Sequence, residues 1–158
     1  MKNTLIYSKI TAIDWPQIIE IEQQVYPNPW PLKIMQDCVA AGYQCIKGTL
    51  ATNPDEIVCY AFMMVGFEET NLLNISVNPQ YQRQSLASQM LHRLMLVSRI
   101  NQAKQMWLEV RESNLAAIRL YEKHGFNSIG KRRNYYIYTT VEGRKVKEHA
   151  IVMAAKIQ

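Results

Sequence analysis

The chain has 158 residues, of which 48% are hydrophobic and 20% are charged, close to the average of globular proteins. A chain of this length is expected to form a single domain, residues 1–158, around one hydrophobic core. Its 18 Lys and Arg against 13 Asp and Glu leave a net charge of +5, which suits an anionic ligand without identifying one.

The cysteines and the apolar stretches bear on the compartment. Cys38, Cys45 and Cys59 show no CxxC spacing, so neither a zinc site nor a disulfide framework is expected. The N-terminus carries no signal-peptide hydrophobic region, and no apolar stretch approaches the roughly 20 residues that span a bilayer. We therefore expect a soluble cytoplasmic protein that needs no metal and no membrane.

The first half of the chain predicts strands and two helices. Asp14 is expected to cap a helix that has Pro16 in its first turn, and the proline-rich run at 27–31 ends that helix. A second short helix is predicted over 32–41, and strands are predicted over 4–10, 43–50, 57–67 and 71–77.

The second half predicts a long helix, a strand followed by a shorter helix, and a closing hairpin. The clearest helix covers 86–101, and Gly125 is expected to end a later helix in the left-handed conformation. The remaining elements are a strand over 106–111, a helix over 114–124, and strands over 127–138 and 149–157 joined by a charged loop around 141–147. Helices and strands alternate while hairpins replace crossovers at both ends, which predicts an α/β fold with a mixed sheet and helices on both faces.

The segment before the long helix has the features of a phosphate-binding turn. A helix N-terminus offers backbone N–H groups without partners and a partial positive charge. Arg83 adds a full charge, and the small residues Ser85, Ala87 and Ser88 let an anion approach. An ordinary capped helix would carry the same residues, so this segment alone does not decide between the two.

Two ionisable side chains stand out further along the chain. Glu109 interrupts an apolar strand and lies on the same face as Trp107 and Arg111. A buried carboxylate is costly unless it is paired or functional, and an ion pair with Arg111 is the plain alternative. Tyr121 shares a helical stripe with Asn114, although a tyrosine that simply faces the core would fit the same pattern.

Three motifs resemble the GNAT superfamily of N-acetyltransferases. Residues 82–87, QRQSLA, resemble its pyrophosphate loop, with Ser85 where glycine is usual. A left-handed backbone at position 85 would cost serine about 1–2 kcal/mol. Residues 108–126, which begin LEVRESN, and the RRNYY segment at 132–136 resemble the subfamily that acetylates the N-terminal alanine of a ribosomal protein. The resemblance covers about residues 15 to 155 and implies the GNAT fold: a mixed, mostly antiparallel sheet with a splayed strand pair.

The resemblance also implies acetyl-CoA as co-substrate and assigns residues to roles. Glu109 is the expected general base and Tyr121 the expected general acid, because an α-amine with a pKa of about 8 must lose a proton and the leaving thiolate must gain one. The expected coenzyme contacts are Ile75, Ser76 and Val77 for the pantetheine arm, Arg83, Gln84, Ser85, Leu86, Ala87 and Ser88 for the pyrophosphate, and Asn114 near the thioester.

The implied acceptor is the N-terminal alanine of a small-subunit ribosomal protein, which attacks directly in a ternary complex. Since the family's substrate has a basic N-terminal stretch, Glu68, Glu69, Glu109 and Glu112 are predicted to form an acidic lip, with Tyr135 as a further substrate contact.

Other interpretations remain open. The hairpin at 137–149 is longer than usual in the subfamily, which weakens the assignment of the substrate more than that of the reaction. A GNAT enzyme for small amines and an acyl-CoA-binding regulator without turnover are the alternatives. Direct binding of nucleic acid is not expected, because the chain shows no aromatic-basic RNA motif.

Overall fold

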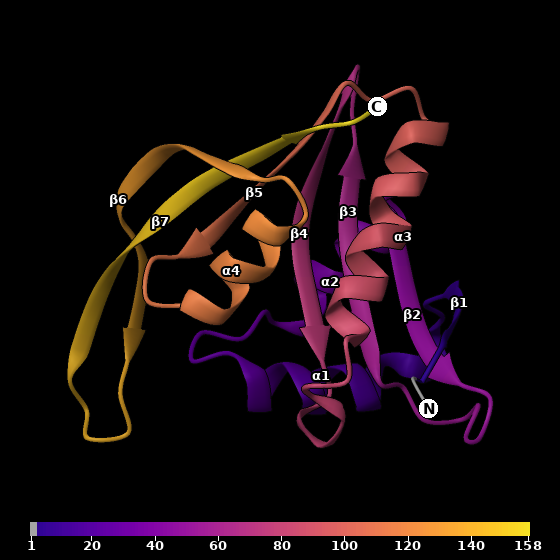
Figure 1. The fold of residues 1–158 in the computed structure, drawn as a ribbon. Coiled ribbons are helices and arrows are strands. Elements are labelled where there is room, and N and C mark those ends of the chain that lie inside the picture. The colour runs from indigo at the N-terminus through magenta and orange to yellow at the C-terminus, as the bar shows by residue number, and fades with distance from the viewer. Residues whose placement is uncertain (1–2) are drawn as a thin grey trace.

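A seven-stranded sheet organises residues 3–158, which the computed structural model describes (Figure 1). The strand order is β1-β2-β3-β4-β5-β7-β6, and every neighbouring pair is antiparallel except β4 and β5. The strands are β1 (Leu5–Lys9), β2 (Gln44–Leu50), β3 (Cys59–Val65), β4 (Glu69–Val77), β5 (Gln105–Arg111), β6 (Asn127–Thr139) and β7 (Lys145–Lys156). The predicted mixed sheet is confirmed.

Helices cover both faces of the sheet, as predicted. They are α1 (Trp15–Val25), α2 (Leu32–Ala40), α3 (Leu86–Ile100) and α4 (Leu115–Lys123), with short 3₁₀ turns η1 (Ala12–Asp14) and η2 (Pro79–Tyr81). α1 and α2 bury a cluster that includes Ile18 and Met35 on one face, while α3 and α4 bury a second cluster around Leu91 and Phe126 on the other (Figure 1). None of the helices within residues 3–158 is long and apolar enough to cross a membrane.

The parallel pair β4 and β5 separates halfway along its length. Pairing runs from Glu69 opposite Gln105 to Leu72 opposite Leu108, and both strands then continue without each other. At the same level Leu73 bulges out of the β3–β4 ladder, and such a bulge bends its strand. The two strand ends therefore diverge (Figure 1), which is the splayed pair that the family resemblance implied.

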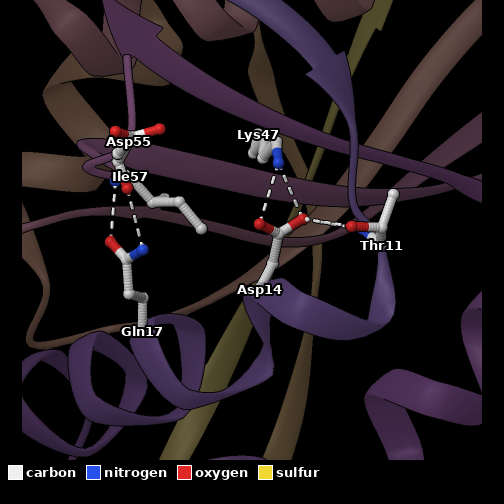
Figure 2. A network of polar contacts seen from close by, with 6 residues as sticks. All are labelled: Thr11, Asp14, Gln17, Lys47, Asp55 and Ile57. Atoms are coloured by element: carbon white, nitrogen blue, oxygen red, sulfur yellow. Dashed lines mark hydrogen bonds and ion pairs between the residues drawn. The ribbon is translucent and has the colours of Figure 1, made fainter. Parts of the chain in front are cut away.

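The prediction that Asp14 caps α1 is wrong. Asp14 ends η1, and its carboxylate turns back to accept a hydrogen bond from the Thr11 backbone N–H at 2.7 Å (Figure 2). The Lys47 ammonium donates to the same carboxylate at 2.8 Å. The Lys47 side chain is only 17% exposed, and a charge so poorly solvated is costly without a counter-ion. The ion pair with Lys47 therefore stabilises the protein more than a cap on α1 would. Gln17, in the next turn, instead ties α1 to the backbone before β3 (Figure 2).

The largest differences from the predicted strand bounds are at β3 and β7, whereas the end of α4 matches its prediction. β3 covers less than the predicted 57–67, whereas β7 begins at Lys145 instead of residue 149, because pairing with β6 resumes beyond an irregular stretch and continues to Thr139. Gly125 adopts the predicted left-handed conformation with φ +91°, and the Phe126 N–H donates to the Tyr121 carbonyl at 3.0 Å.

Candidate active site

A cleft of about 420 Å³ opens where β4 and β5 part. Its walls come from α1 and the loop after it, the free ends of both strands, the start of α4 and the middle of β6. Because the strands have separated, the cleft passes between the two faces of the sheet. Side chains from opposite faces can therefore meet in it.

Glu109 and Tyr121 both line this cleft. On β5, Leu108 and Val110 are buried in the cluster under α3 and α4, so the alternation of the strand turns Glu109 toward the face that carries α1. Tyr121 projects from α4, on the other face of the sheet. The two predicted catalytic residues thus reach one cleft from opposite sides.

Arg132 of β6 holds the Glu109 carboxylate. Its Nε lies 2.9 Å from Glu109 Oε1, and the Glu109 side chain is 14% exposed. The alternative ion pair between Glu109 and Arg111 is therefore wrong, since Arg111 instead lies 3.7 Å from Glu148 of β7. Within residues 3–158 no ion pair engages the second oxygen, Oε2. The Tyr135 phenol also lies beside this carboxylate, and burial together with the negative charge of Glu109 raises the pKa of Tyr135.

The Tyr121 side chain is buried and forms part of the wall of the cleft. The ring packs against Phe126 with 5.7 Å between centroids. Burial raises the pKa of the Tyr121 phenol well above its ordinary value of 10.0, and Tyr26 and Tyr136 shift the pKa in the same direction. The phenol is therefore protonated at neutral pH.

The loop before α3 has the backbone that glycine would favour. Ser85 adopts φ +62° and ψ +21° directly before the helix, and its side chain makes no capping hydrogen bond. Arg83 also has a positive φ, of +63°, and is exposed. A left-handed residue next to a right-handed helix gathers successive N–H groups into an anion-binding concavity.

Several side chains of that loop are engaged inside the protein. Gln84 accepts a hydrogen bond from Asn3, Leu86 is buried, and Ser88 Oγ lies 2.7 Å from His124 Nε2 of α4. An anion would therefore meet backbone N–H groups and Arg83 more than these side chains. Asn114, which lines the cleft, caps α4 by accepting from the Ala117 N–H at 3.2 Å.

The free edge of β4 presents backbone groups to the cleft. The Tyr26 hydroxyl donates to the Ile75 carbonyl at 2.6 Å, on the side from which β5 has departed. Because the N–H and C=O of one strand residue project to the same side, Ile75 and Val77 direct their N–H groups into the gap. The Ser76 side chain instead donates to Asn74 Oδ1 at 2.8 Å within a buried polar network.

Glu22 is a buried carboxylate at the cleft that the sequence analysis missed. It is 1% exposed and accepts hydrogen bonds from the Tyr60 hydroxyl at 2.6 Å, the Asn74 amide at 3.0 Å and the Trp30 N–H at 2.9 Å. A signal was present, because Glu22 sits on the apolar stripe of α1 where a charge is unusual. Arg132 was also missed as a site residue, since a side-chain contact from β6 to β5 across β7 could not be foreseen.

The predicted acidic lip does not exist. Glu69 lies opposite Gln105 at the start of the parallel pair, whereas Glu109 lies four residues further along β5, roughly 13 Å away. Glu68 pairs with Lys104 at 3.0 Å at that distant end, and Glu112 lies 3.6 Å from Lys131. Parallel pairing places the strand starts and the cleft at opposite ends. Tyr135, in contrast, does line the cleft.

Comparison with known proteins identifies the family. Residues 15–126 match the Acetyltransferase (GNAT) family. The chain is 37% identical over 150 residues to the [ribosomal protein bS18]-alanine N-acetyltransferase of Escherichia coli, covering 95% of this chain and 96% of that protein. The crystal structure of the Escherichia coli enzyme superposes with a TM-score of 0.85 at 35% identity, covering 98% of this chain and 95% of that chain. Arabidopsis thaliana NAA60, solved in complex with acetyl-CoA, has the same fold at 16% identity, with a TM-score of 0.82 over 98% of this chain and 99% of that chain. The chain therefore belongs to the GNAT family of acetyltransferases.

Proposed function

We propose that this protein transfers the acetyl group of acetyl-CoA to the N-terminal α-amine of a protein, most specifically to the N-terminal alanine of a small-subunit ribosomal protein. One observation carries the proposal: Glu109 and Tyr121 face a single cleft in a chain that is 37% identical over nearly its whole length to an enzyme with that activity. We further propose that the enzyme acts in the cytoplasm as a single domain.

The residues around the cleft fit acetyl-CoA. The coenzyme is an anion with amide groups along its arm, and it supplies an activated acetyl thioester. The N–H groups at the start of α3, together with Arg83, suit its phosphates. The unpaired edge of β4 at Ile75 and Val77 suits its amides, because free strand edges offer both donors and acceptors.

Glu109 and Tyr121 then move the protons of acetyl transfer: the ammonium loses one to Glu109 before attack, the attacking nitrogen loses a second to Glu109 or water as the amide forms, and the leaving sulfur gains one. Glu109 accepts a proton from the α-ammonium, directly or through a water, while Arg132 fixes the carboxylate. The amine can attack only after this proton is lost. Tyr121 donates its phenol proton to the departing thiolate, so that coenzyme A leaves as a thiol, and the phenolate then regains a proton from water. The free N–H of Ile75 offers a hydrogen bond to the negative charge that develops on the acetyl oxygen.

Tyr135 stands at the mouth of the cleft and is proposed to contact the acceptor. Tyr135 is 48% exposed, and the Arg132 guanidinium lies over its ring, 5.3 Å from the centroid. An extended peptide that places its α-amine at Glu109 would pass this ring on its way out. Glu112 is not proposed as an acceptor contact, because its carboxylate forms an ion pair with Lys131.

The test is acetylation followed by mass spectrometry. The purified protein and acetyl-CoA are mixed with a peptide that has the N-terminus of the ribosomal protein, with the same peptide already blocked at its α-amine, and with a panel of small amines. We expect one acetyl group on the free peptide and none on the blocked one. Glu109→Gln and Tyr121→Phe should each lower kcat by about 10²- to 10⁴-fold. Acetylation of the small amines alone would refute the protein-acceptor assignment.

A further inference from the structure

The positive charge of this protein is concentrated in the β6–β7 hairpin. Residues 127–156 carry seven Lys and Arg against two Glu, a net charge of +5, which equals the net charge of the whole chain. The remaining residues carry eleven charges of each sign. The net positive charge of the chain therefore comes from the hairpin, and the rest of the protein is neutral overall.

The far end of the hairpin projects beyond the sheet (Figure 1). We call residues 133–147 the distal hairpin. Its cations are Arg133, Arg144, Lys145 and Lys147, and all four are exposed. No ion pair within residues 3–158 involves any of these four cations. Their charge is thus available to a partner.

The two lysines of the distal hairpin face away from the cleft. Tyr136 lines the cleft and pairs directly with Glu148, so these two residues share one face of the ribbon. Lys147 and Lys145 are one and three residues from Glu148, so strand alternation places them on the other face, beside Ile137 and Thr139. A partner on the lysine face would therefore not occupy the acceptor cleft.

We propose that the distal hairpin binds the phosphodiester backbone of RNA, without regard to base sequence, while the acceptor N-terminus lies in the cleft. The identity of the partner rests on the proposed function, since an assembled ribosomal protein lies against RNA. Exposed Arg and Lys are the side chains that neutralise phosphates. The contact is to the backbone because the bases of an RNA duplex are inaccessible in its narrow major groove. This inference replaces the expectation, drawn from motifs alone, that the protein does not bind nucleic acid.

Binding of the full-length protein to a short RNA hairpin, followed by fluorescence anisotropy over a series of salt concentrations, tests the proposal. Each neutralised phosphate contributes roughly 0.7 to 0.9 to the slope of log K against log salt. Four cations predict a slope of about −3 and a loss of affinity of about 50- to 150-fold between 50 and 200 mM salt. The triple variant R144A/K145A/K147A should reduce the slope by about 2 to 3.

Matched variants make the result decisive. The control K9A/K33A/R99A removes three exposed cations from β1, α2 and α3 and should leave the slope unchanged. The hairpin variant should acetylate the free peptide with unchanged kcat and KM, because its substitutions lie outside the cleft. The proposal is overturned if RNA does not bind, if the control loses as much as the hairpin variant, or if polyglutamate competes as well as RNA. Acetylation of the free peptide is measured without RNA, so a failure of the proposed reaction is seen separately.

Discussion

Replacing Ser85 with glycine should stabilise the protein. Ser85 holds φ +62° directly before α3, where a residue with a Cβ is strained by about 1–2 kcal/mol. Glycine removes that strain but loses about 0.4–1 kcal/mol through the greater freedom of the unfolded chain. No capping hydrogen bond is sacrificed, since the Ser85 side chain makes none. The free energy of unfolding should therefore rise by about 0.5–1 kcal/mol.

Thermal unfolding of the coenzyme-free protein measures the effect. For a chain of this size the gain corresponds to a rise in Tm of roughly 1–4 °C. Ser85→Ala, which keeps the Cβ and removes only the hydroxyl, should leave Tm unchanged. Ser88→Gly, three residues later inside the helix, should instead lower the stability by about 2 kcal/mol, because it weakens the helix and removes the hydrogen bond to His124.

The sign of the difference decides the argument. If Ser85→Gly lowers Tm, or if Ser85→Ala raises it as much as glycine does, the strain at this position is not the one we infer. Coenzyme affinity provides a second readout. Since glycine can adopt the same backbone without strain, Ser85→Gly should bind acetyl-CoA at least as tightly as the natural sequence.

Three further predictions test the packing and electrostatics of the fold. Gly48→Ala should lower the free energy of unfolding by about 1–3 kcal/mol in urea, because the added Cβ would lie 2.7 Å from the Cys59 sulfur; an unchanged midpoint would contradict this packing. Lys47→Met should cost about 3–5 kcal/mol by the same measurement, since it leaves the nearly buried Asp14 without its cation, and restoring stability with Asp14→Asn in the double variant would confirm the coupling. Burial lowers the pKa of His124 below 6.5, so the unfolded state binds more protons in acid. Stability should fall as the pH decreases below about 6.5, and this fall should be smaller in His124→Gln.

Local signals in the sequence predicted the elements well. The end of α4 could be foreseen because Gly125 and Phe126 form a cap from neighbouring residues alone, and the structure has that cap. The alternation around Glu109 likewise placed its side chain on the face that the structure shows. Such features depend on spacing along one segment, which the sequence displays directly.

Features that depend on pairing between distant segments could not be foreseen. Asp14 has the position of a helix cap in the sequence. Its actual partner, Lys47, lies 33 residues away on β2, so nothing in the local sequence indicates the ion pair. The prediction of an acidic lip was wrong because it requires Glu69 and Glu109 to lie at the same end of the sheet. Glu69 begins β4 and Glu109 lies near the end of β5, and in a parallel pair these two positions are far apart. The ion pair between Arg132 and Glu109 could not be predicted, because it depends on β5 and β6 lying on either side of β7.

One parallel pairing explains why the parts of the candidate site lie together. Parallel neighbours need a crossover connection, and here α3 crosses from the end of β4 to the start of β5. The N-terminus of α3 must then lie at the end of the sheet where β4 finishes. The bulge at Leu73 bends β4 and the strands part toward that same end, so the free strand edge opens beside the helix N-terminus. An anion-binding turn, exposed backbone N–H groups and a cleft open to both faces thus follow from a single topological choice, and the sequence adds Glu109 and Tyr121 to it.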